Sequence, residues 1–323
     1  MRYLAIAAGA ALLAAAPAFA QDDRSDWPEA FTVATASQGG TYFVYGAGWT
    51  NLVSEALGIP GGAEVTGGPV QNAALVQTGD LDMGMVTLGP AADAIAGEST
   101  LAPGLPHDQL RAMFPMYTTG FHMVVPASKG WESIADIPDG ATIGVGPQGG
   151  TPGTYWPRFF ETLGKDIEVR YGGASDLAGQ MQDGLIDGFA FAAGLPFPAF
   201  SELDAQMDVV FIGFTAEEVE TITAEHPVSA FTIPAETYPS QPQEQNSVSM
   251  WNFAVVNAAL PDSFVYAVVD TVMSNNEAMM IVHKAARETV PENFDKNNVI
   301  PWHPGAVRWF EENGFEIPDD LEG

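Results

Sequence analysis

The 323-residue sequence contains no cysteine. This absence excludes disulfide bonds, a thiolate nucleophile and any metal site with cysteine ligands. The five histidines are scattered without metal-ligand spacing, and the chain has neither a G-x-S-x-G nor an H-E-x-x-H motif. The sequence therefore predicts no catalytic residue and no metal, and we expect no cofactor.

Positive charge is scarce as well, with 11 Lys and Arg residues against 41 Asp and Glu residues. Such an acidic chain repels nucleic acid and anionic lipid, so we expect no nucleic-acid partner. The excess of acidic residues favours solubility. It does not fix the charge of a ligand, because a cleft can differ from the surface around it.

A long apolar run occurs only at the N-terminus. Arg2 precedes an apolar segment at residues 3–16, and Pro17 and the small-residue sequence Ala18-Phe19-Ala20 follow it. This order is typical of a secretory signal peptide, and the run is short for a membrane-spanning helix. We expect cleavage after Ala20, a flexible tail at residues 21–30 and a periplasmic mature protein that does not span the membrane. An uncleaved anchor is the alternative.

Strands and helices alternate in two successive sets along the rest of the chain. Strands are expected at residues 31–36, 64–65, 83–87, 121–126, 141–145, 167–171 and 186–191. The apolar segment 248–256 is expected to carry the chain back to the first lobe. Helices are expected between strands within each set, and residues 262–290 are expected to be mostly helical. This order predicts an α/β fold with a parallel sheet in each of two lobes. We expect residues 31–124 and 247–323 to form the first lobe and residues 125–246 the second.

A glycine-rich turn follows the first predicted strand, in Ser37-Gln38-Gly39-Gly40-Thr41-Tyr42. Such a turn exposes backbone N–H groups at the positive end of a helix dipole and can hold a carboxylate or phosphate without a basic side chain. Ser37, Thr41 and Tyr42 can add hydroxyl groups. A plain helix cap uses the same residue types, so that alternative stays open.

Two further turns have the same character. Thr66-Gly67-Gly68 leads into a predicted helix that contains Asn72, and Gly149-Gly150-Thr151-Pro152-Gly153-Thr154 leads into another. The second helix can begin at Thr151 or at Thr154, and the earlier start places Pro157 inside the helix, where proline is costly. The G-x-G-x-x-G at 144–149 is not expected to bind a dinucleotide, because Pro147 removes an N–H donor.

Taken in order, these segments resemble the extracytoplasmic receptors of TRAP transporters, specifically the TAXI family. Residues 34–42 resemble the family's first strand and glycine turn, and residues 66–72 resemble its T-G-G-S-x-x-N segment with Pro69 in place of Ser. Residues 300–306, followed by Asn313-Gly314, resemble its C-terminal signature. Two departures, Leu88-Gly89 and the longer turn at 149–154, fall where a ligand is expected.

The resemblance implies a type II periplasmic-binding-protein fold, with two α/β lobes, a hinge and a ligand cleft between the lobes. The implied partner is a membrane TRAP permease, and the implied ligand is a small organic anion, a carboxylate or an amino acid such as glutamate. A ligand sensor for a signalling kinase and a periplasmic enzyme on the same fold are the alternatives.

The predicted ligand-binding residues come from the turns and from the ends of the predicted strands. They are Ser37, Gly39, Gly40, Thr41, Tyr42, Thr66, Gly68, Asn72, Leu88, Gln148, Gly150, Thr151, Thr154, Phe191 and Gly194. The charged or titratable candidates for pairing with an anion are Arg111, Lys129, Arg158, Arg170 and His122, none of which lies in a motif.

Overall fold

The structure, a computed structural model, describes residues 24–323. The predicted signal peptide and its cleavage site lie outside the described residues. Within the expected tail, the Trp27 indole packs edge-on against Phe264 and donates a hydrogen bond to Ser263 Oγ at 2.8 Å. This part of the tail therefore lies against the body of the protein.

The predicted strand–turn–helix order is present twice. The first set is β1 (Phe31–Ala34), α1 (Thr41–Leu57), β2 (Gly61–Glu64), α2 (Pro69–Thr78), β3 (Met83–Thr87) and α3 (Leu88–Ala96). The second set is β5 (Thr142–Gly144), α4 (Thr151–Thr162), β6 (Glu168–Arg170), α5 (Ala174–Gln182) and β7 (Gly188–Ala193). The strands of each set pair in parallel, in the orders β2-β1-β3 and β6-β5-β7. The two halves thus share one topology.

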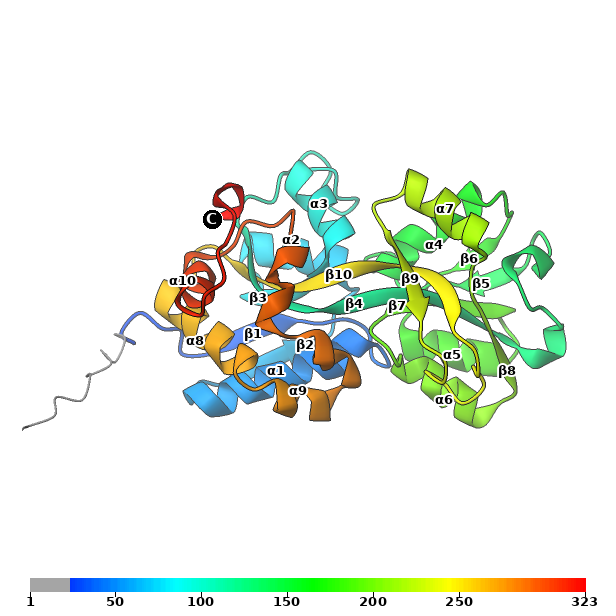
Figure 1. Cartoon of the computed structure of the whole chain (residues 1–323), viewed down its shortest axis with the longest axis horizontal. Coiled ribbons are helices and arrows are strands. Elements are labelled where there is room, and N and C mark those ends of the chain that lie inside the picture. Colours follow the sequence, from blue (N-terminus) through cyan, green and yellow to red (C-terminus); the bar gives the residue numbers. More distant parts are fainter. Residues whose placement is uncertain (1–23) are drawn as a thin grey trace, which may run out of the picture.

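Two long strands, β4 (Leu110–Pro126) and β10 (Gln245–Asn257), run antiparallel through both halves of the molecule (Figure 1). The partner of β4 changes between Thr119, which pairs with β10, and Gly120, which pairs with β7. The partner of β10 changes between Ser249, which pairs with β9 (Ser229–Ile233), and Met250, which pairs with β4. The predicted strand at 121–126 and the apolar segment 248–256 are therefore parts of longer crossing strands.

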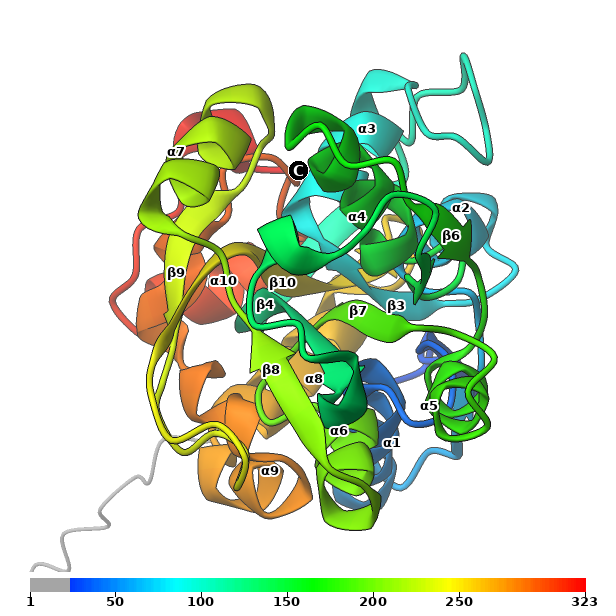
Figure 2. The same cartoon turned by 90° about the vertical axis from the view of Figure 1, so that its right-hand side faces the viewer.

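The remaining elements complete the two halves. They are α6 (Pro198–Gln206), β8 (Val209–Ile212), α7 (Ala216–Glu225), α8 (Asp262–Met273), α9 (Asn276–Val282) and α10 (Pro304–Glu312). Viewed along the molecule, the sheet lies between α3 and α4 on one side and α1 and α6 on the other (Figure 2). Within residues 24–323, no helix is both long and apolar enough to cross a membrane.

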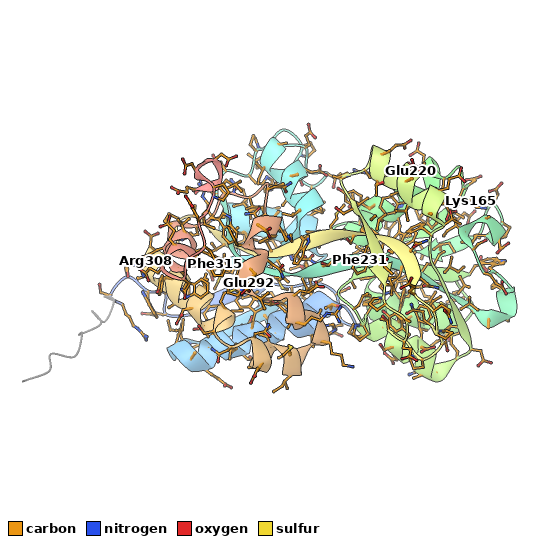
Figure 3. The ribbon with its side chains drawn as sticks, viewed as in Figure 1. Lys165, Glu220, Phe231, Glu292, Arg308 and Phe315 are labelled. Atoms are coloured by element: carbon orange, nitrogen blue, oxygen red, sulfur yellow. The ribbon has the colours of Figure 1, made fainter. Side chains whose placement is uncertain are left out.

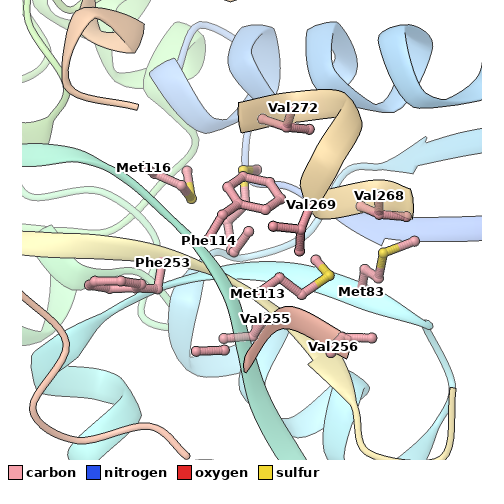
Figure 4. Packing of buried hydrophobic residues seen from close by; sticks show 14 of the residues in the cluster. Met83, Met113, Phe114, Met116, Phe253, Val255, Val256, Val268, Val269 and Val272 are labelled. Carbon is pink, nitrogen blue, oxygen red and sulfur yellow. The ribbon is translucent and has the colours of Figure 1, made fainter. Parts of the chain in front are cut away.

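Each half has its own apolar core. The core of the first lobe gathers residues from 31–117 and 253–317, and in it the valines of α8 pack over Phe114 and the methionines of β3 and β4 (Figure 4). The second lobe is built from 121–250, and alternate residues of β4 and β7 belong to cores on opposite faces of the sheet. Exposed charges such as Glu220 and Glu292 lie on the outside of the two lobes (Figure 3).

Residues 262–290 are mostly helical, as expected, but they form separate helices rather than one. α8 ends at Met273, and α9 is followed by a short 3-10 turn at Lys284–Glu288. Asn275 Nδ2 donates to Thr271 O at 2.7 Å, and Asn276 Nδ2 donates to Ala286 O at 2.6 Å. Asparagine side chains compete with the helical backbone for its hydrogen bonds, which favours a break at this point.

Candidate functional site

A small cavity lies between the lobes. The centre of a water molecule can occupy about 40 Å³ of it. Both lobes and both crossing strands contribute to its walls. The lining residues are Ala36, Ser37, Gly40, Thr41, Tyr42, Gly67, Gly68, Pro69, Thr87, Thr119, Pro147, Gly150, Thr151, Pro152, Phe191, Ala192, Ala193 and Asn252. The three glycine-rich turns of the sequence therefore meet at one cavity.

Four helices begin at this cavity. Their N-cap residues are Gly40 for α1, Gly68 for α2, Thr87 for α3 and Gly150 for α4, and none of the four makes a side-chain cap hydrogen bond. The first N–H groups of a helix have no intrahelical acceptor, and the helix dipole makes this end positive. The arrangement therefore favours an electron-rich or anionic group inside the cavity.

The start of α4 settles the choice that the sequence left open. The helix begins at Thr151, after Gly150 as N-cap, and Pro157 lies inside it. Thr154 is thus a first-turn residue rather than the cap, and its hydroxyl donates back to Gly150 O at 3.1 Å.

The floor of the cavity is a polar cluster formed by the crossing strands and the start of α1. Tyr42 Oη donates to Asn252 Oδ1 at 2.6 Å, and Asn252 Nδ2 donates to Tyr117 O at 2.5 Å. Thr119 Oγ1 lies 2.7 Å from Asn252 Nδ2. Burial raises the pKa of the Tyr42 hydroxyl, so this group stays protonated and remains a donor. These groups largely satisfy one another and fix the floor rigidly.

Thr119 and Asn252 were not among the predicted site residues. Asn252 is a fully buried amide within the otherwise apolar part of β10 at residues 250–256. A buried polar side chain needs a partner, so its position inside an otherwise apolar run was the available signal.

Hydrogen bonds join the two lobes around the cavity. Thr41 Oγ1 donates to Gly194 O at 2.9 Å, and the Ala174 N–H donates to Ser37 Oγ at 3.2 Å. The hydroxyls of Thr87 and Thr151 also meet, one from each lobe. The structure is therefore a closed arrangement of the lobes.

Glycine is required where the lobes approach most closely. Gly39 has a φ of 79°, and a Cβ there would lie 2.5 Å from Ser175 Oγ of the second lobe. Gly68 has a φ of 107°, and a Cβ there would lie 3.1 Å from Gly150 Cα. Any larger residue would be strained at both positions and would also hold the lobes apart.

The structure brings about half of the predicted residues to the cavity wall. Those that line it are Ser37, Gly40, Thr41, Tyr42, Gly68, Gly150, Thr151 and Phe191. Gly39 and Gly194 instead offer carbonyl oxygens to the opposite lobe. Gln148 is exposed, and Leu88 lines a separate groove beside Met250.

Thr66 and Asn72 lie behind the wall. Asn72 is fully buried, and its Nδ2 donates to Thr35 O at 2.7 Å and to Met85 O at 2.8 Å. Its Oδ1 accepts a hydrogen bond from Thr66 Oγ1 at 2.6 Å. Asn72 thus ties the ends of β1 and β3 to the turn that lines the cavity.

Among the described residues, no charged side chain lines the cavity. Lys129 forms a salt bridge with Asp187 at 2.5 Å, which holds the pKa of that carboxyl below its usual value. Arg158 lies over the Tyr155 ring, Arg111 donates to Asp108 O, and Arg170 is exposed. None of these cations is placed to pair with a group in the cavity.

His122 does not line the cavity either. It is buried between Gly120 O, 3.1 Å from Nδ1, and Tyr238 Oη, 2.8 Å from Nε2. Burial lowers the pKa of this histidine to about 4, so the ring is neutral at neutral pH. Within residues 24–323 there is also no cluster of three or more His, Asp or Glu residues that could hold a metal ion.

Comparison with solved structures shows the fold class. The periplasmic binding protein BugD matches with a TM-score of 0.59 and 12% identity, covering 90% of this chain and 99% of that one. MatC from Rhodopseudomonas palustris, described with bound malate, matches with a TM-score of 0.58 and 15% identity, covering 88% of this chain and 96% of that one. The type II periplasmic-binding-protein fold expected from the sequence is therefore confirmed.

Two further comparisons concern the family. No curated protein matches the chain significantly. The model of the NMT1-like family matches residues 33–314, which is most of the sequence. The chain therefore belongs to the NMT1-like family.

Proposed function

We propose that this protein is the extracytoplasmic solute-binding receptor of a TAXI-type TRAP transporter, which binds a small organic anion and delivers it to the membrane permease. One observation carries the proposal: both lobes build a single cavity at which four helices begin. The confirmed fold and the family resemblance of residues 34–42, 66–72 and 300–306 support it.

The binding step follows from the sheet. The partners of β4 and β10 change at Thr119–Gly120 and Ser249–Met250, so bending there moves the lobes with little disruption of either core. A ligand that contacts both lobes does so only in the closed form. Its differential affinity for that form shifts the population toward closure. The closed protein then presents a joint surface of both lobes to the permease.

The test uses the chain from residue 21 onward and a library of organic acids and amino acids. We expect calorimetric binding by at least one acid, accompanied by a smaller radius of gyration in solution scattering. Where a neighbouring gene encodes a permease, vesicles that contain this permease should take up that acid only when the protein is present. Absence of binding across the library would contradict the proposal, and recovery of a chemically altered ligand would indicate an enzyme instead.

A further inference from the structure

The distribution of hydrogen-bond donors narrows the class of ligand, an inference that rests on the proposed function. We infer that the cavity binds a short-chain monocarboxylate, with its carboxylate at the start of α1 and its apolar chain against the second lobe. Dicarboxylates and α-amino acids are then poor ligands.

The start of α1 is a donor site in the cavity. Neither Thr41 nor Tyr42, its first two residues, is a proline, so both carry N–H groups without intrahelical acceptors. α2 begins with Pro69, which has no N–H, and its Val70 N–H donates to Gly149 O of the other lobe at 3.0 Å. α2 therefore has fewer free donors than α1, although its dipole still adds to the positive potential.

The second lobe presents a largely apolar wall opposite α1. Pro147 and Pro152 supply no N–H groups, and Pro152 removes one from the first turn of α4. Phe191 stacks on Phe197 with ring centroids 4.4 Å apart and planes 6° from parallel, which fixes its ring at the cavity. A methylene chain fits this wall, whereas a second carboxylate would find fewer donors there than at α1, because Thr151 is the only one of the first two residues of α4 with an N–H group.

The polar side chains of the cavity are neutral, and most of them already have partners. Tyr42 and Asn252 bond to each other, Thr41 bonds to Gly194, and Thr87 bonds to Thr151. An α-ammonium group would find no carboxylate on the described walls of the cavity. A buried charge without a partner is strongly unfavourable. The desolvation free energy of an amino acid's ammonium group would therefore not be offset by any contact in the cavity.

The size of the cavity agrees with a small ligand. About 40 Å³ is open to the centres of water-sized atoms, which is a few times the minimum for one water molecule. A ligand of few heavy atoms fits this closed form, and a long chain does not.

The test is a set of four compounds of equal carbon number, titrated into the mature chain by calorimetry. Butyrate is the expected ligand, 2-aminobutyrate adds an ammonium group, succinate adds a second carboxylate, and butyramide removes the charge. We expect each of the last three to bind at least about tenfold more weakly than butyrate, because each leaves a buried group unpaired or removes the anion.

The outcomes separate this inference from the proposed function. Binding of succinate, 2-aminobutyrate or glutamate as tight as that of butyrate, with lobe closure, would overturn the inference and leave the receptor function intact. Equal binding of butyramide would overturn the carboxylate position. If no organic acid binds at all, the proposed function itself fails.

A pair of variants tests the apolar wall. Phe191→Leu enlarges the cavity, whereas Phe200→Leu changes a fully buried core residue that does not line it. We expect Phe191→Leu to shift the preference from butyrate toward hexanoate by about tenfold and Phe200→Leu to leave the preference unchanged. Circular dichroism establishes that both variants are folded. An unchanged preference in folded Phe191→Leu protein would overturn the placement of the chain.

Discussion

Asn72 offers a test between a ligand-binding role and a structural one. Its amide donates to Thr35 O and Met85 O, and it accepts a hydrogen bond from Thr66 Oγ1, in a fully buried setting. Asn72→Ala would leave Met85 O without this donor and create a small void. Thr66 Oγ1 can still donate to Thr35 O, from which it lies 3.0 Å. With about 1–3 kcal/mol for each unsatisfied buried group, we expect a loss of about 2–4 kcal/mol in the free energy of unfolding.

The assay is urea denaturation of the ligand-free protein, followed by calorimetry with the ligand found in the screen. Thr78→Ala is the matched control, because Thr78 is an exposed residue of the same helix and its change should cost less than about 0.5 kcal/mol. We expect Asn72→Ala to lower the unfolding midpoint far more than the control does. An unchanged midpoint together with a large loss of affinity would refute the structural role and show that Asn72 binds the ligand.

Three further predictions concern the closed form and pH. In a double-mutant cycle of Thr87→Val and Thr151→Val, the losses in binding free energy should be non-additive by about 0.5–1.5 kcal/mol. Additive losses would mean that the two hydroxyls do not pair in the bound state. Asn252→Ala should lower both the melting temperature and the affinity for the ligand, because it leaves the Tyr42 hydroxyl without its acceptor. An unchanged affinity would mean that this polar cluster does not take part in ligand binding. The pKa of His122 is about 4 in the folded protein, below the ordinary 6.5, so its contribution to stability is complete above about pH 6.5 and is lost as the pH falls toward 4. Denaturation across this range should show a shallower pH dependence in His122→Gln, and an identical slope would contradict the assignment.

The sequence predicted the fold well because the local signals and the global arrangement agree. β1, β3 and α1 are marked by alternating or apolar runs and by glycines at their ends, as at Gly58. The extent of β4 was missed because residues 110–120 show no strict alternation of polar and apolar residues: the strand is buried along nearly its whole length. The expected lobe limits at 124 and 247 fall inside β4 and β10, and they stay a prediction.

The site was predicted less completely, for a physical reason. Local sequence shows that a turn can expose amides, but it does not show which turns face one another. Ser37, Gly68 and Gly150 line the same cavity because the two parallel parts of the sheet place the ends of β1, β2 and β5 toward the gap between the lobes. Asparagine is a residue type expected in a ligand-binding site, but Asn72 lies behind the cavity wall. Its amide there donates to buried carbonyl groups.

The same turns that form the cavity also make hydrogen bonds between the lobes. Their contacts therefore influence the equilibrium between the open and closed forms. The second N–H groups of α2, α5 and α6 donate across the gap: Val70 to Gly149 O, Ser175 to Gln38 O and Ala199 to Gly39 O, at 3.0–3.2 Å. In an open form these amides would return to water, so each bond contributes only about 0.5–1.5 kcal/mol net. Ordering the turns offsets part of that gain. We therefore expect closure without a ligand to be close to balanced, so that a small ligand adding a few kcal/mol through the amides of α1 is enough to shift the population.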